Sequence, residues 1–92
     1  MIKSFKHKGL EQFFNKNIKK ALDVRDIARI TRILDRLDTA IIVKDMDIPG
    51  WNLHELKGNR KGTWSVAVRQ NWKITFRFMN GEVYDVNLED YH

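Results

Sequence analysis

The sequence contains no cysteine and a single proline, and no long apolar run interrupts its charged residues. Without cysteine, neither a disulfide nor a thiolate metal site is available. No stretch approaches the ~20 apolar residues of a membrane span, and the opening MIKSFKHKGL lacks the apolar segment of a signal peptide. We therefore expect a soluble, unprocessed, cytoplasmic protein with no membrane partner.

What is present fits one folded unit. The chain has 92 residues, of which 42% are hydrophobic and 32% charged, a globular rather than a disordered composition. A chain of this length can bury one core without covalent staples. No repeat or linker divides it, so residues 1–92 are predicted to be a single domain.

The N-terminal half shows helical spacing. Residues 2–6 suit a short first strand, after which Leu10, Phe13 and Phe14 follow at the spacing of one helical face. Asp23 is a good N-cap for a second helix, with Asp26 as a weak capping-box partner. The second helix has an apolar face of Ile27, Ile30, Ile33, Leu34 and Leu37.

A second stripe on this helix is basic. It consists of Arg25, Arg29, Arg32 and Arg36, which step by four, three and four residues. We interpret the stripe as a solvated face; the alternative is a docking surface for a partner or a phosphate backbone.

After the turn DMDIPGWN the period changes to two. Apolar and polar residues alternate over 64–69, 72–78 and 84–88, which predicts antiparallel strands with one apolar face. A three-residue turn, Met79-Asn80-Gly81, pairs Phe76 with Tyr84 and keeps that face uniform. We expect an α+β fold in which two N-terminal helices pack on one face of a small, mainly antiparallel sheet.

The uncovered face of this sheet is predicted to be basic. Lys73, Thr75 and Arg77 share one side, with Arg69 at the end of the neighbouring strand. Between residues 54 and 77 six cations accompany one carboxylate, a typical footprint for a polyanion. Such a face suits single-stranded RNA.

Three histidines are the groups whose ordinary pKa lies near neutrality. His7 reads as structural or exposed, whereas His54 and His92 border the basic face. They have no local ligand pair, so no metal site and no cofactor are predicted. Metal-free RNA cleavage needs a base for the 2′-hydroxyl, an acid for the leaving oxygen, and cations for the phosphorus-centred charge. Histidine, lysine and arginine supply all three.

Several motifs then occur in a characteristic order. The stretch LHELKGNRKGTWSVAVRQNWKITFRF, the terminal EDYH, the opening MIKSFKHKGLEQFF and the segment DMDIPGWNLH together resemble the HigB host-inhibition-of-growth toxins over essentially the whole chain. The resemblance implies a RelE-superfamily fold and a toxin that cuts messenger RNA in the ribosomal A site. It also implies a HigA-type helix-turn-helix antitoxin, with operator DNA bound only through the toxin–antitoxin complex.

Site residues carry over where the motifs match. The resemblance implies that the catalytic residues are His54, Lys57, Lys73, Tyr91 and His92. The expected roles are proton transfer for the two histidines, charge stabilisation for the two lysines, and stacking on or positioning of the cleaved nucleotide for Tyr91. The residues expected to bind RNA are Arg60, Lys61, Arg69, Arg77 and Asp90. Two positions depart from the family pattern: Lys73 stands where arginine is common, and Glu55 where proline is frequent. Lysine keeps the charge but loses the two-pronged guanidinium grip on phosphate.

Two alternatives stay open. The first is a non-catalytic module that binds RNA or protein and in which the histidines are incidental. The second is a DNA-binding regulator acting alone, which is disfavoured because the sequence offers no helix-turn-helix pair.

Overall fold

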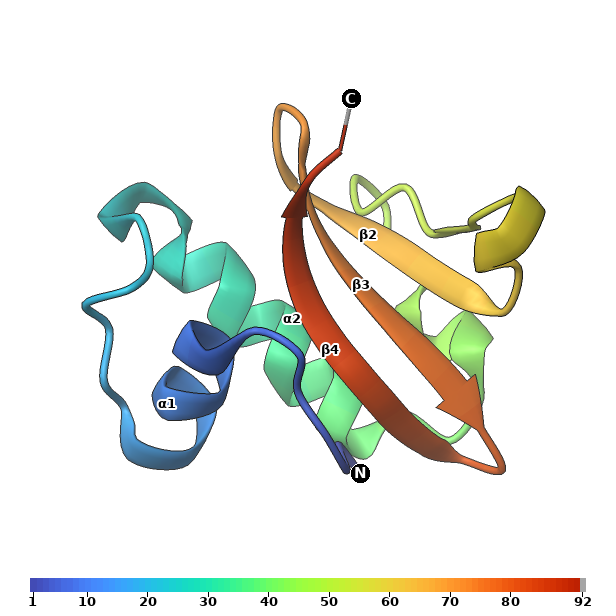
Figure 1. Cartoon of the computed structure of the whole chain (residues 1–92), viewed down its shortest axis with the longest axis horizontal. Helices are drawn as coiled ribbons and strands as arrows, with labels where there is room; N and C mark the ends of the chain where they lie inside the picture. The colour runs from blue at the N-terminus through green and yellow to red at the C-terminus, as the bar shows by residue number, and fades with distance from the viewer. Residues whose placement is uncertain (92) are drawn as a thin grey trace.

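The computed structural model describes residues 1–91 and shows a four-stranded sheet with two helices on one face (Figure 1). Helix α1 spans Lys8–Lys16 and α2 spans Ile27–Thr39; short 3-10 helices cover Val24–Asp26 (η1), Val43–Met46 (η2) and Gly58–Arg60 (η3). The strands are β1 (His54–Glu55), β2 (Thr63–Arg69), β3 (Trp72–Met79) and β4 (Glu82–Asp90), adjacent in that order and antiparallel. The predicted α+β class is confirmed.

Helix α1 forms where the apolar spacing predicted it. Leu10 is fully buried, and Phe13 and Phe14 pack against the core beside it. The helix begins at His7, whose Nδ1 accepts a hydrogen bond from the Leu10 amide at 3.1 Å. It ends at Asn17, which adopts the left-handed conformation that closes many helices. His7 is therefore structural, as expected.

Helix α2 also follows its predicted face, but its start differs in detail. Asp23 caps the preceding turn by accepting from the Arg25 amide at 2.9 Å. The predicted capping role of Asp26 is wrong, because its carboxylate makes no cap bond and instead binds Arg69 from the sheet. The buried apolar residues of the helix are Ile30, Ile33, Leu34 and Leu37.

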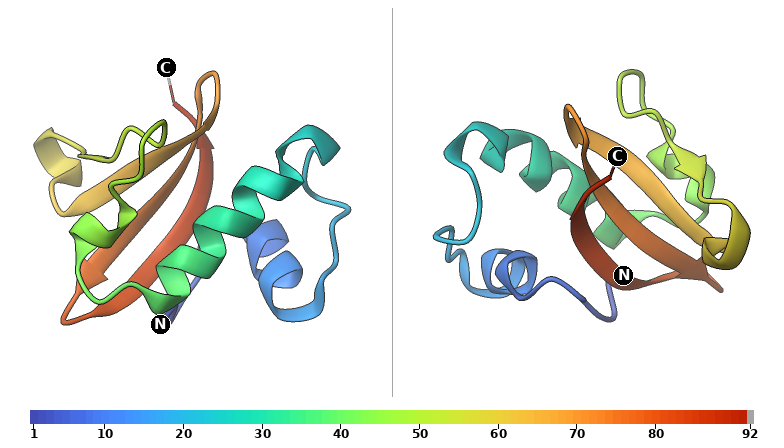
Figure 2. Two further views of the ribbon diagram at one scale, coloured as in Figure 1. Left: turned by 180° about the vertical axis from the view of Figure 1, so that it is seen from behind. Right: turned by 45° about the horizontal axis from the view of Figure 1, so that its top comes forward.

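The core lies between these helices and the apolar side of the sheet (Figure 2). The sheet contributes Val66, Ile74, Phe76, Val83 and Val86, all fully buried. Met46 and Trp51, from the segment after α2, complete the cluster. Burial of each such side chain stabilises the fold by roughly 1.5–3 kcal/mol, so packing against the helices occupies this side of the sheet. The polar side remains accessible to a ligand.

The arginine stripe on α2 is neither a solvated face nor a free docking surface throughout. Arg29 donates to the carbonyl oxygens of Ala67 at 3.2 Å and Gly50 at 2.7 Å, and Arg36 donates to that of Asp45 at 2.6 Å. The guanidinium groups of Arg29 and Arg32 also lie over the Trp51 ring. The stripe thus ties α2 to the segment that returns to the sheet.

The predicted register of the last hairpin is wrong. Met79 pairs with Glu82 and Arg77 with Tyr84, so the turn holds two residues, Asn80 and Gly81. An irregularity then occurs beside Asp85, which has a φ of 56°. This bulge returns the following residues to the predicted faces, so that Ile74 pairs with Leu88. The extra residue lies within the strand, not in the turn.

The predicted first strand, residues 2–6, is present only as two isolated parallel bridges to β4. Ile2 pairs with Val83 and Phe5 with Val86. The segment runs along the outer edge of β4, where the Asp38 carboxylate holds the Ile2 amide at 3.0 Å. It covers a sheet edge that would otherwise be open.

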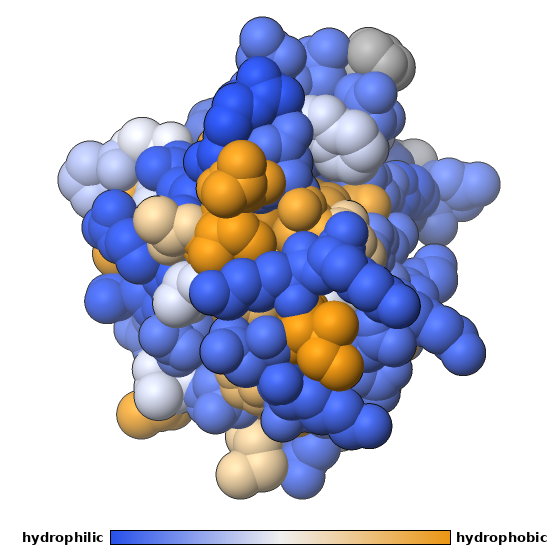
Figure 3. Space-filling model, turned by 90° about the vertical axis from the view of Figure 1, so that its left-hand side faces the viewer, coloured by the Kyte–Doolittle hydropathy of each residue, from blue (hydrophilic) through white to orange (hydrophobic). Residues whose placement is uncertain are grey.

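The side of the molecule where α1 lies carries an apolar strip among hydrophilic residues (Figure 3). A hollow of about 210 Å³ on the helices is lined partly by Phe13, Phe14 and Leu34. No helix within residues 1–91 has both the length and the apolar character needed to cross a bilayer.

Candidate active site

The side of the sheet turned away from α1 and α2, here named the open face, holds most of the predicted site. Strand pairing places His54 beside Ser65, Ser65 beside Thr75, and Thr75 beside Asn87 in one row across all four strands. In the next row Lys73 lies between Ala67 and Glu89. Arg77 occupies the row on the other side, between Thr63 and Tyr84.

His54 is oriented by its neighbours. Its Nδ1 lies 3.0 Å from the carbonyl oxygen of Asn52, and its Nε2 lies 3.4 Å from the Ser65 hydroxyl oxygen. Because a carbonyl only accepts, the first contact favours the tautomer with hydrogen on Nδ1 and leaves Nε2 as the basic nitrogen. The imidazole is half-buried at the edge of the open face.

A carboxylate from the edge strand β4, that of Glu89, reaches into this basic face. Arg60 donates from its two terminal nitrogens to the two Glu89 oxygens, at 2.9 Å and 2.7 Å. The Thr75 hydroxyl donates to the same carboxylate at 2.6 Å, and the Asn87 amide lies 3.4 Å from it. Hydrogen bonding to Arg60 is the main reason that the pKa of Glu89 falls to about 2, so this carboxylate is ionised at neutral pH.

This contact changes the shape of the face. Arg60 belongs to η3, beyond β1, whereas Glu89 belongs to β4 at the other side of the sheet. The side chain therefore reaches over β2 and β3, and Ser65 and Thr75 are almost completely buried. The predicted row of Lys73, Thr75 and Arg77 exists, but its middle member is covered.

Beside the Arg60–Glu89 pair lies a hollow of about 130 Å³. All of its lining residues are polar or charged, and three of them are cations from distant parts of the chain. The lining residues are Lys6, Asn59, Arg60, Thr63, Thr75, Arg77, Asp85 and Glu89.

Four of the predicted cations are available for a ligand. Lys57, Lys61 and Arg77 are exposed and Lys73 is half-buried. Within residues 1–91, none of these four side chains forms an ion pair.

The C-terminal segment is held at one end of the open face. The Tyr91 amide donates to the Asn71 carbonyl in the β2–β3 turn at 2.8 Å, and its side chain is 42% exposed. Hydrogen bonding to Glu89 is the main reason that the pKa of Arg60 is raised, and the Tyr91 phenol makes a smaller electrostatic contribution. Asp90 pairs with Trp72 and is exposed. His92 lies outside the described residues.

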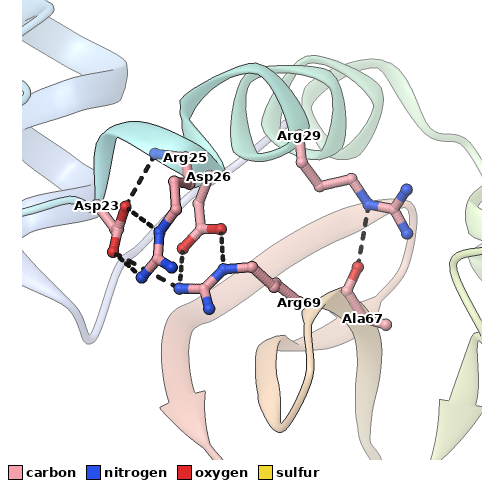
Figure 4. A network of polar contacts seen from close by, with 6 residues as sticks. All are labelled: Asp23, Arg25, Asp26, Arg29, Ala67 and Arg69. Atoms are coloured by element: carbon pink, nitrogen blue, oxygen red, sulfur yellow. Dashed lines mark hydrogen bonds and ion pairs between the residues drawn. The ribbon is translucent and has the colours of Figure 1, made fainter.

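Arg69 is not where the alternation placed it. The register of β2 shifts between Ala67 and Arg69, so Arg69 pairs with Trp72 and lies on the helix side. There it donates from Nε to Asp26 at 2.8 Å and lies 3.6 Å from Asp23 (Figure 4). The predicted position of Arg69 on the open face is therefore wrong. It joins the β2–β3 hairpin to the start of α2.

Sequence reasoning missed Glu89 and the bulge that turns Arg69 away. No group of three histidine, aspartate or glutamate side chains within residues 1–91 is arranged to hold a metal ion. What the described site offers is one oriented imidazole, several cations and a phenol on one polar face, the groups that acid–base chemistry on a phosphodiester uses.

Comparisons with known proteins agree with this chemistry. A family profile described as "RelE-like toxin of type II toxin-antitoxin system HigB" matches residues 3–92. The chain is 48% identical over 92 residues, all of both proteins, to Endoribonuclease HigB of Proteus vulgaris. It is 33% identical over 91 residues to Toxin HigB-1 of Vibrio cholerae, covering 97% of this chain and 96% of that one.

The fold has solved counterparts. The crystal structure of YafQ from E. coli superposes with a TM-score of 0.57 and 12% identity, covering 96% of this chain and 89% of that one. At that identity the likeness concerns the fold alone.

Proposed function

The chain belongs to the RelE-like HigB toxins of type II toxin–antitoxin systems, and we propose that this endoribonuclease cuts messenger RNA in the ribosomal A site and so stops translation. The observation that supports the proposal best is the open face. His54 shares it with Lys73 and Arg77, so a proton-transfer group and phosphate-binding cations lie on one surface. Two strand spacings, about 10 Å, separate β1 from β3, a span suited to a nucleotide.

In this proposal the bond to phosphorus is broken by the RNA's own 2′-hydroxyl. A general base removes its proton, the 2′-oxygen attacks phosphorus, and a general acid protonates the departing 5′-oxygen, leaving a 2′,3′-cyclic phosphate. We assign proton transfer to His92 and His54. Lys57 and Lys73 stabilise the charge that builds on the phosphoryl oxygens.

The remaining residues bind and orient RNA. Tyr91, exposed at the end of the face, stacks on or positions the nucleotide that is cut. Arg60, Lys61 and Arg77 border the path of the strand. We assign Asp90, which pairs with Trp72 at the end of β4, to RNA contact at the C-terminal end of that path. No cofactor takes part in this scheme.

The partners follow from the family. A toxin of a type II system has an antitoxin partner. We propose that this antitoxin is of the HigA type, with a helix-turn-helix domain, and that operator DNA is bound only by the complex. The other partners are the 70S ribosome and its mRNA, which places the toxin in the cytoplasm.

The decisive experiment compares His54→Gln and His92→Gln with the parent chain. Each variant is expected to lower single-turnover cleavage of ribosome-bound mRNA by about a hundredfold or more while RNA affinity stays within a few fold. His7→Gln, which changes the side chain that caps α1, is the matched control and should cut normally. If both active-site variants cut at the parent rate, the chain is instead a non-catalytic binding module.

A further inference from the structure

Glu89 is the residue on the open face that the proposed reaction leaves unexplained. A carboxylate on a surface that attracts phosphate weakens the binding of RNA, because the carboxylate and the phosphate are both negative. Yet both of its oxygens are occupied, by two bonds from Arg60 and one from Thr75, with the Asn87 amide near by. A group so completely bonded has a defined position, and so does the group it holds.

That group is Arg60. A guanidinium carries five N–H donors in one plane, and Glu89 takes one from each terminal nitrogen. Within residues 1–91 the Arg60 side chain donates only to Glu89, so the edge formed by Nε and an outer N–H stays unused. Two parallel bonds fix the plane of a side chain that otherwise samples many rotamers.

Arg60 also lines the 130 Å³ hollow of the open face. Lys6 and Arg77 add two further cations to this lining, against the carboxylates of Asp85 and Glu89. The phenol of Tyr91 acts electrostatically on the same guanidinium. Arg60 therefore borders the hollow and is also within electrostatic range of Tyr91, one of the residues assigned to the reaction.

We propose that Glu89 is a positioning residue for RNA cleavage, which holds the Arg60 guanidinium across the open face with its free edge toward a phosphate of the RNA. The inference rests on the proposed function and adds the residue that orients its central cation. Thr75, buried beneath the pair, fixes the carboxylate in turn.

Proton transfer is a poor alternative role for Glu89. Its pKa of about 2, lowered chiefly by Arg60, makes it a weak base near neutrality. A purely structural role is the remaining alternative, and the double-mutant cycle described below distinguishes it from orientation of Arg60.

The test is Glu89→Gln, which keeps the side chain's size and one acceptor but removes its charge. We expect the single-turnover rate on mRNA-programmed 70S ribosomes to fall about tenfold to a hundredfold, as expected when a phosphate-binding group is misplaced. Affinity for a short labelled single-stranded RNA should be unchanged or higher, because one negative charge is lost. A cleavage rate equal to or above that of the parent overturns the proposal.

The matched control is Glu82→Gln. Glu82 is also in β4 but lies at its turn end, opposite Met79, where it interacts with Lys3 and the N-terminal amine and not with Arg60. It loses the same charge and should cut at the parent rate. Equal rate losses in the two variants overturn the inference, since they indicate a general effect of charge or stability.

A double-mutant cycle with Arg60→Lys separates positioning from structure. Lysine cannot make the two-point contact, so Glu89→Gln should lower the rate much less in the Arg60→Lys background than alone. Additive losses overturn the inference. If Glu89→Gln does not fold, Glu89→Asp retains the charge, shortens the reach, and should show the same loss of rate at constant RNA affinity; an unchanged rate there overturns it. Failure of the parent chain to cut RNA refutes the proposed function instead.

Discussion

His7 shows how a single side chain can link stability to pH. Its Nδ1 accepts the Leu10 amide at the start of α1, which requires the imidazole to be unprotonated on that nitrogen. Burial lowers its pKa from the ordinary value of 6.5. The same ring crowds Gly9, where an added Cβ would lie 2.8 Å from His7 Cε1 and 2.5 Å from Ala21 Cβ. A larger residue at position 9 would therefore clash with His7 and Ala21.

The lowered pKa predicts the direction of the pH dependence. The folded state binds this proton more weakly than the unfolded state, so the cap is fully effective above about pH 6.5. Its contribution, about 0.5–1 kcal/mol, declines as the pH falls from there through the lower folded-state pKa. His7→Asn retains a capping oxygen that does not titrate. Urea unfolding at about pH 7 and pH 5 should show a smaller loss of stability for His7→Asn than for the parent; equal losses would contradict this role.

At the scale of elements, the join between α2 and the sheet depends on arginine bonds to backbone carbonyls. Arg29 donates to the Ala67 carbonyl in β2 (Figure 4). It also donates to the Gly50 carbonyl in the loop that precedes β1. A partly buried carbonyl that loses its donor costs free energy even when the removed side chain is replaced by an apolar one.

We therefore predict that Arg29→Met lowers the free energy of unfolding by about 1–3 kcal/mol. Arg32→Met is the matched control, because Arg32 is exposed and only lies over the Trp51 ring at 6.0 Å. It should cost less than about 1 kcal/mol. Chemical denaturation of both variants measures the difference, and comparable losses would show that the carbonyl bonds matter little.

The elements themselves were largely predictable from the sequence. Leu10 with Phe13, and Ile30 with Leu34, repeat at helical spacing, and Ile74 with Phe76 alternates as a half-buried strand does. The two bulges were not predictable. Neither Val68 nor Asp85 carries a glycine-like signal, yet the irregularities beside them change which residues share a face.

The site was predictable only in part for the same reason. Periodicity two was enough to place Lys73 and Arg77 on one side. The bulge beside Val68 moved Arg69 to the other side. The Arg60–Glu89 pair is a side-chain contact across the sheet between residues 29 positions apart, which no local sequence pattern indicates. Contacts of this kind depend on tertiary structure.

At the scale of the whole molecule, the two sides differ in character. The helices bury the apolar side of the sheet, and the open face collects cations from the N-terminal segment, η3 and β3. The formal net charge of +5 therefore attracts RNA toward a defined surface.

This arrangement predicts a salt-dependent affinity for single-stranded RNA. If Lys57, Lys73 and Arg77 each neutralise one phosphate, the logarithm of the binding constant should fall with the logarithm of salt concentration with a slope of about −2. Arg77→Gln should make the slope less steep by about 0.7. Lys16→Gln, at the end of α1, should leave the slope unchanged. A titration by fluorescence anisotropy tests this, and identical slopes for Arg77→Gln and the parent would place the RNA elsewhere.

The side chain that spans from η3 to β4 also bears on how substrates are chosen. Since Arg60 joins η3 to the far strand, we expect the ion pair to restrain movement of this turn when an RNA strand arrives. The RNA then binds a surface that is already in its binding conformation. Discrimination between messages then depends on how well each one matches a rigid template, and little of the binding energy is diverted into reshaping the protein.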